Sequence, residues 1–269
     1  MFARACHYSI HLHCRTCSIA KQHLIASFCC HRTMVSPTIS IIDLLHHIAE
    51  QDWELFQSIA LSNSTTFRAI TNAIGNSPEF SGVTLLHAAV RFNPPLDVVS
   101  KMIDICPDLL AAKDCLGRTP LHVAAGSSAE PGLIKLIAHA HPASCDATDE
   151  DGKTPLHFAC DTSCQLFEED EDPNRPMPRA VCHDTVIALL SESLHASTIE
   201  DIDEINALEY AIMSDAKLKT VKLLQHASCK SFRSRSTSNS PSPSPSPCPA
   251  PPKKMPRRVS SQTEMDISH

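Results

Sequence analysis

TPLHVA, at residues 119–124, recurs 35 residues further along the chain as TPLHFA, at residues 154–159. A related stretch, TLLHAA, occupies residues 84–89, another 35 residues upstream, and each copy follows a glycine by two positions. A fixed period of this size is the signature of an array of stacked repeats. Such arrays usually work by presenting a surface, so the period bears on function as well as on fold.

The repeated motif carries the signals of a helix start. Thr119 and Thr154 can cap a helix, because a threonine hydroxyl accepts a hydrogen bond from an otherwise unpaired N–H of the first turn. Pro120 and Pro155 follow at the first helical position, where the missing N–H of proline costs nothing. Leucine and alanine then recur at helical spacing, and the small alanine lets a second helix pack closely.

A turn precedes each of the two fullest copies. Residues 114–117 and 149–152 share the pattern Asp-x-x-Gly. Turn and motif together resemble the ankyrin repeat, in which a turn, Thr-Pro-Leu-His-x-Ala and two antiparallel helices form one unit. The resemblance implies an all-α solenoid with short turn fingers. It also implies a structural role for three histidines, which would tie adjacent repeats together by hydrogen bonds: His87, His122 and His157.

Further segments complete the array. Second helices are predicted where apolar residues recur at helical spacing, at residues 97–103, 133–137 and 186–190. Atypical copies are expected at both ends, at residues 44–61 and 206–224, because a terminal repeat meets water on one face. We predict an ankyrin-repeat domain over residues 37–228, with about five repeats near residues 41–75, 79–113, 114–148, 149–201 and 203–228.

The fourth repeat contains an insertion. The interval from Leu156 to Leu208 is 52 residues, and the extra length falls at residues 165–179, which include the run EEDED and three prolines. Such a run builds no core, so we expect an exposed acidic loop. Two roles are open for it, a solvated spacer or a docking element for a basic partner.

Charge divides the chain into three parts. Residues 1–42 carry a net charge of +4, residues 43–229 carry −16, and residues 230–269 carry +5. An acidic body argues against nucleic-acid binding, which needs clustered Lys and Arg. It favours a protein partner that is basic or neutral. The alternative is that the acidity only keeps the solenoid in solution.

The C-terminal segment, residues 229–269, is predicted to be a disordered tail. Its last 40 residues contain 11 Ser and 8 Pro. Ser-Pro pairs suit proline-directed kinases, and Arg257-Arg258-Val259-Ser260 resembles a site of basophilic kinases, so the candidate phosphorylation sites are Ser240, Ser242, Ser244, Ser246 and Ser260. A phosphate adds about −1.5 to −2 charges, so modification would cancel the positive charge of the tail and release it from the acidic body. The alternative is an unmodified flexible tail.

The N-terminal residues 1–36 are basic and rich in Cys and His. Cys14, Cys17, His23 and Cys29 offer four candidate zinc ligands. The segment has one Cys-x-x-Cys pair and no second one, so we expect no metal site. An organelle transit peptide is another interpretation of this basic, acid-free start. We predict an unstructured extension.

The sequence gives little support to catalysis. It lacks a phosphate-cradling glycine loop, and the recurring histidines belong to the repeat motif, so we predict no enzyme activity, no small-molecule substrate and no cofactor. The cysteines outside residues 1–36 show no framework spacing, which suits a reducing compartment, cytoplasmic or nuclear. The sequence contains no apolar run of about 20 residues, so we expect no membrane span.

We therefore predict a non-catalytic protein-interaction module, a scaffold or adaptor. Self-assembly and zinc-dependent regulation are the alternatives. The resemblance implies that a partner meets the turn tips and the inner face of each first helix. These positions are Phe80, Ser81, Val83, Arg91, Phe92, Cys115, Leu116, Arg118, Ser127, Glu150, Asp151, Lys153, Asp161 and Thr162.

Overall fold

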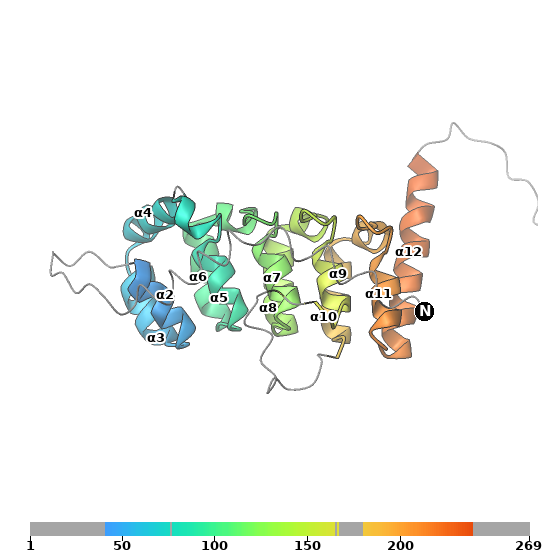
Figure 1. Ribbon diagram of the computed structural model, residues 1–269, viewed down its shortest axis with the longest axis horizontal. Coiled ribbons are helices and arrows are strands. Elements are labelled where there is room, and N and C mark those ends of the chain that lie inside the picture. Colours follow the sequence, from blue (N-terminus) through green and yellow to red (C-terminus); the bar gives the residue numbers. More distant parts are fainter. Residues whose placement is uncertain (1–40, 76, 165, 167–179, 239–269) are drawn as a thin grey trace, which may run out of the picture.

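The computed structural model describes residues 41–75, 77–164, 166 and 180–238, and these residues form helices, turns and no strand. Figure 1 shows the helices following one another in a single elongated row. The predicted all-α solenoid is confirmed. The first repeat contains α2 (Ile41–Ala49), α3 (Trp53–Phe56), a π-helical turn (Gln57–Leu61) and α4 (Ser64–Gly75).

Four helix pairs follow the first repeat. They are α5 (Leu85–Arg91) with α6 (Leu96–Ile105), α7 (Pro120–Gly126) with α8 (Pro131–Ala140), α9 (Pro155–Cys160) with α10 (His183–Glu192), and α11 (Ala207–Met213) with α12 (Leu218–Ser238). Short 3₁₀ helices lead from one repeat to the next at Pro78–Phe80, Pro107–Leu110, Pro142–Cys145 and His195–Thr198.

Each first helix begins at a capping box, in which two residues bond each other's backbone N–H. In α7, the hydroxyl of Thr119 accepts the N–H of His122, while Nδ1 of His122 accepts the N–H of Thr119 at 3.0 Å. The same pairing opens α5 and α9. In α11 the two roles pass to Asn206 and Glu209, whose carboxylate accepts the N–H of Asn206 at 2.8 Å. Histidine thus takes the place that glutamate usually has in a capping box.

The turns that precede these helices stack on one another as fingers. The N–H of Cys115 donates to the carbonyl of Ser81 at 2.7 Å, and the same bond joins Glu150 to Leu116 at 2.9 Å and Ile202 to Asp151 at 3.0 Å. Glycine is required at this contact: Gly82 has a φ of +77°, and a Cβ added there would lie 2.7 Å from the carbonyl oxygen of Lys113.

One continuous hydrophobic core runs through the helix pairs. Each first helix contributes a leucine from the repeated motif, and each second helix contributes a residue on its inner side, so that Leu121, Leu133 and Ile137 are all fully buried. The buried polar groups include the capping Thr and His residues of the repeated motif, and these are hydrogen-bonded. Each repeat therefore depends on its neighbours, as expected for a solenoid.

The structure corrects two predicted boundaries. The first repeat was expected to be a helix pair, but it also contains α4, which buries Phe67, Ile70 and Ile74 at helical spacing. The tail was expected to lack regular structure from residue 229, yet α12 continues to Ser238 and rises past the row of 3₁₀ helices in Figure 1. No Pro or Gly interrupts residues 218–238, and Ser231 is still buried, so packing supports the additional turns.

None of the helices among the described residues combines the length and the apolar character that a membrane crossing requires.

Candidate protein-binding surface

Three buried histidines join each repeat to the next one. Nε2 of His87 lies 3.0 Å from the carbonyl of Arg118, and the equivalent distances are 3.0 Å from His122 to Lys153 and 3.2 Å from His157 to Ile205. Because Nδ1 already accepts a backbone N–H in the capping box, the ring carries its proton on Nε2 and donates it to that carbonyl. The structural role that the resemblance implied for these histidines is confirmed.

The bridge works with a neutral ring. Burial lowers the pKa of His122 to about 3, and burial also lowers the pKa of His87 and of His157. Glu209 replaces histidine in the last repeat, after which the described residues contain no further finger. The exposed carboxylate of Glu209 accepts the N–H of Asn206 and so completes the capping box of α11. The histidines therefore belong to the scaffold that positions the surface.

The tips of the four fingers form the surface that these bridges hold in place. We define the fingertip row as Ser81, Cys115, Leu116, Glu150, Asp151, Ile202, Asp203 and Glu204. Four exposed carboxylates lie in the last two fingers, at Glu150, Asp151, Asp203 and Glu204. The last finger also contains Ile202, which is 67% exposed. The row changes along its length from small or apolar residues to carboxylates around one isoleucine.

Aspartates at the base of the fingers fix their shape. Oδ1 of Asp149 accepts the N–H of Asp151 at 3.0 Å and that of Lys153 at 2.8 Å. Asp201 makes the corresponding bonds to Asp203 and Ile205, both at 3.0 Å. Burial raises the pKa of Asp149 to about 6, although its bond from Lys153 acts in the opposite direction. The fingers are thus rigid turns, and their tip side chains point away from a fixed backbone.

The structure places the predicted binding residues in three environments. Cys115, Glu150 and Asp151 are exposed. Others are half-buried: Ser81, Val83, Arg91, Leu116, Ser127, Lys153 and Thr162, together with Phe80 and Phe92, which pack against the hydrophobic core. Arg118 and Asp161 are buried, each 5% exposed. The two phenylalanines thus contribute to packing, and the two buried charged side chains do not belong to the exposed surface.

Arg118 is committed to the interior, which corrects its assignment to the partner-facing surface. Its Nη2 lies 2.7 Å from the carboxylate of Asp114, and its Nη1 donates to the carbonyl of Leu166 at 3.0 Å. Leu166 itself is buried against Gly126, where an added Cβ would lie 2.7 Å from the leucine side chain. The segment after α9 therefore folds back onto α7, and Leu166, which was predicted to belong to an exposed loop, is anchored there.

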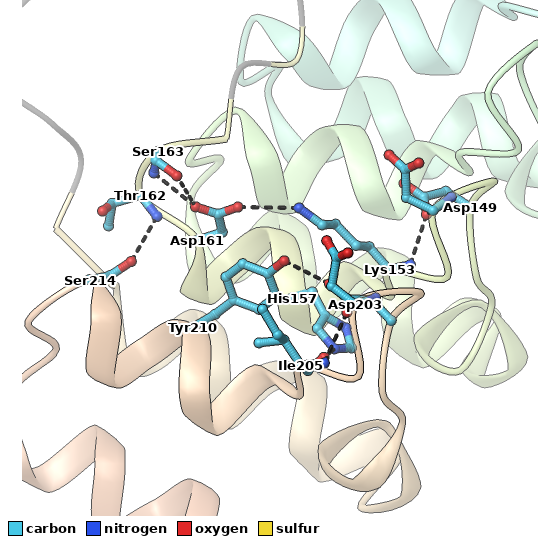
Figure 2. A network of polar contacts seen from close by, with 12 residues as sticks. Asp149, Lys153, His157, Asp161, Thr162, Ser163, Asp203, Ile205, Tyr210 and Ser214 are labelled. Atoms are coloured by element: carbon cyan, nitrogen blue, oxygen red, sulfur yellow. Dashed lines mark hydrogen bonds and ion pairs between the residues drawn. The ribbon is translucent and has the colours of Figure 1, made fainter. Parts of the chain in front are cut away.

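Asp161 is held inside a polar network between the fourth and fifth repeats, which Figure 2 shows. Nζ of Lys153 lies 3.5 Å from the carboxylate of Asp161 and 4.8 Å from the centre of the Tyr210 ring. Burial alone would lower the pKa of Lys153, but the Asp161 carboxylate and Tyr210 together outweigh burial and raise that pKa. The hydroxyl of Tyr210 donates to Asp201 at 2.6 Å. Asp161 and most of the Lys153 side chain thus hold the two repeats together.

The last finger was not recognised in the sequence. Residues 201–204 repeat the Asp-x-x-Gly pattern with Glu204 in the place of glycine, at a φ of +61°. The signal available was the position of Asp201, 52 residues after Asp149, which is the same interval that separates Leu156 from Leu208. Ile202, Asp203 and Tyr210 all follow from that alignment.

Other predicted sites stand apart from this surface. The candidate zinc ligands Cys14, Cys17, His23 and Cys29 and the five candidate phosphorylation sites lie outside the described residues. Within the described residues, no group of three or more His, Cys, Asp or Glu side chains is placed to hold a metal ion. His157 and Cys160 lie three residues apart on α9 and are both buried, and burial raises the pKa of the Cys160 thiol to about 12, so this His and Cys form no reactive pair.

The described fold is a solenoid of helix pairs with stacked finger turns, held together by capping-box histidines. Residues 86–177 match the family model of ankyrin repeats in three copies, so this stretch of the chain is an array of ankyrin repeats. A comparison with curated proteins gives no match. Ankyrin repeats are generally protein–protein interaction modules and are typically non-catalytic.

The buried histidines predict that acid weakens the fold. The pKa of His122 is about 3 in the folded chain against 6.5 in the unfolded chain. The contribution of neutral His122 to the free energy of unfolding is complete above pH 6.5. It is lost as the pH falls from 6.5 towards 3, because only the unfolded chain binds the proton in that range. Between pH 7 and pH 5 this costs about 2 kcal/mol of unfolding free energy for one such histidine.

Urea unfolding at pH 7 and at pH 5 measures this loss. In His122→Gln the loss should shrink by that amount, whereas His46→Gln, at an exposed position on α2, should leave it unchanged. An identical pH dependence in His122→Gln and in the parent chain would contradict the neutral bridge.

Arg118 predicts a large effect on stability. Arg118→Ala leaves the Asp114 carboxylate buried without its ion pair, so we expect a loss of about 3–5 kcal/mol in urea unfolding. Lys101 forms an exposed ion pair with Asp97, and Lys101→Ala should cost less than about 1 kcal/mol. Equal losses in the two variants would show that Arg118 is not a structural residue.

Proposed function

We propose that this protein is a non-catalytic adaptor whose fingertip row binds a basic segment of a partner protein. The observation that carries the proposal is the grouping of four exposed carboxylates around one exposed isoleucine: Glu150, Asp151, Asp203 and Glu204 around Ile202. No Lys or Arg belongs to the fingertip row as defined above. Such a surface suits a partner segment with Lys or Arg next to an apolar side chain.

Rigidity supports this surface as a recognition site. Adjacent fingers are joined by backbone hydrogen bonds of 2.7–3.0 Å, and Asp149 and Asp201 fix the turns behind the tips. A preformed surface binds with little loss of conformational freedom, because its side chains and backbone are already ordered. The carboxylates would chiefly accelerate association and select the sign of the partner, while Ile202 supplies the apolar contact.

The net charge of the repeat domain also favours a basic partner, independently of the residues of the fingertip row. Residues 43–229 carry a net charge of −16. A partner segment with several Lys or Arg residues would be attracted over roughly a Debye length of 8 Å at physiological ionic strength. We therefore expect binding that weakens as salt is added, mainly through a slower association rate.

Charge reversal in the fingertip row tests the proposed function. The full chain is used to capture partners from native extract, and the affinity of each identified partner is then measured by titration. The double variant Glu150→Lys/Asp203→Lys should bind at least about tenfold more weakly, as expected when a charge pair is made repulsive. Asp43→Lys/Glu54→Lys makes the same change of net charge at exposed positions of the first repeat and should bind within twofold of the parent.

An equal loss of affinity in both double variants would mean that binding depends only on the net charge of the protein. Unchanged affinity in the fingertip variant would reject this surface. Circular dichroism establishes that both variants are folded.

We also propose that the C-terminal tail competes for the same carboxylates. Residues 230–269 carry a net charge of +5, and they include the five candidate phosphorylation sites. Phosphate groups of about −1.5 to −2 charges each would cancel that charge and leave the fingertip row open to a partner.

The intact mass of the protein isolated from its native source measures this modification. We expect species that carry one or more phosphates, located by fragmentation to Ser240, Ser242, Ser244, Ser246 or Ser260. An unmodified mass under all growth conditions would reject the phosphate switch and leave the fingertip proposal standing.

A further inference from the structure

The second helices of the last two repeats, α10 and α12, enclose a shallow hollow of 220 Å³. Five of its eight lining residues are aliphatic. Ile187 on α10 is 44% exposed, and Leu194 and Leu223 are half-buried beside it. Pockets for small molecules usually measure about 300–1,000 Å³, so this hollow suits a single apolar side chain of a peptide better than a free ligand.

Ile187 is exceptional among the repeats. Its counterparts in the other second helices, found by aligning the repeated motifs, are Ser100 on α6, Lys135 on α8 and Lys222 on α12. The other three second helices thus have a polar or charged residue at this position. An isoleucine at the one position that borders the hollow is the pattern expected of a contact surface.

The rim of the hollow is basic, although the body of the protein is acidic. His226 and Lys230 of α12 line it and are exposed. All charged residues of α12 are Lys or Arg, namely Lys219, Lys222, Lys230, Arg233 and Arg235. The facing helix α10 has two acidic residues, Asp184 in its first turn and Glu192 in its last turn. Glu192 is directed to the other side, where its carboxylate lies 3.3 Å from Nδ1 of His139 on α8.

We propose that this hollow binds an acidic peptide segment of a partner protein, with one aliphatic or aromatic side chain inserted beside Ile187 and carboxylates against the α12 lysines. Charge complementarity selects this occupant. The two terminal segments of this chain, residues 1–40 and 239–269, are both basic in net charge and would be repelled by the rim, whereas the acidic residues 168–172 would compete with the partner for it. The protein then has two docking surfaces of opposite sign, the fingertip row and the hollow between α10 and α12.

Two labelled 12-residue peptides test the proposal on the full chain by fluorescence anisotropy. They share the same two leucines, and their remaining charged positions are all Glu in one peptide and all Lys in the other. The Glu peptide should bind with a Kd of about 10–100 μM, a range typical of small peptide contacts, and added salt should weaken it. Ile187→Asp should weaken the Glu peptide at least about tenfold by placing a like charge in the hollow.

Ile202→Asp is the matched control, because it changes the same residue type on the fingertip row. It should leave the Glu peptide within twofold of the parent. Lys230→Glu should weaken the Glu peptide severalfold, and because Lys230 is exposed at the rim, this variant remains informative if Ile187→Asp unfolds. The Lys peptide reports on the fingertip row, so failure of one surface is distinguished from failure of the other.

Three results would overturn the proposal. The first is a Glu peptide that does not bind below about 1 mM, well outside the range of specific peptide contacts. The second is an affinity that neither Ile187→Asp nor Lys230→Glu alters. The third is a dimer in light scattering that Ile187→Asp dissociates, which would assign the hollow to a second copy of this chain.

Discussion

The fold depends on a neutral histidine that makes two hydrogen bonds in opposite directions. Nδ1 of His122 accepts the N–H of the residue that caps its own helix, and Nε2 donates to a carbonyl of the next finger. One side chain therefore starts a helix and sets the position of the following repeat. A protonated ring could not accept the first bond, and a ring with its proton on Nδ1 could make neither. Each bridge needs the next finger in a fixed place in space, and His157 reaches Ile205 although an insertion separates their two repeats.

The surfaces follow from that scaffold. The bridges and the Asp-x-x-Gly turns leave the fingertips with no packing role, so these residues can vary, and they change from Ser81 and Cys115 to Glu150, Asp151, Asp203 and Glu204. On the other helix layer, the charged residues of α12 are all basic, and this last described helix borders a hollow with an exposed isoleucine. Opposite charges on separate layers would allow one rigid chain to hold two partners at once, which is the arrangement that an adaptor needs.

Sequence patterns predicted the helix pairs and the role of the histidines, because those features recur at a fixed period and use specific capping residues. The binding residues were predicted less well. Arg118 and Lys153 precede the threonine of their motifs in equivalent positions, and both were assigned to the surface by that position alone. Whether such a side chain is exposed depends on the segment after α9, which folds back so that Leu166 covers Gly126 and accepts a bond from Arg118. That contact joins residues 48 positions apart, and no local pattern encodes it.

The protonation state of His122 is the most direct test of this view of the fold. Long-range ¹H–¹⁵N correlation spectra of the histidine rings distinguish the two neutral tautomers from the cation. The bridge predicts that at pH 5 the His122 ring is still neutral and carries its proton on Nε2, because burial lowers its pKa to about 3. A ring that is cationic at pH 5 in the folded protein, or one protonated on Nδ1, would contradict it.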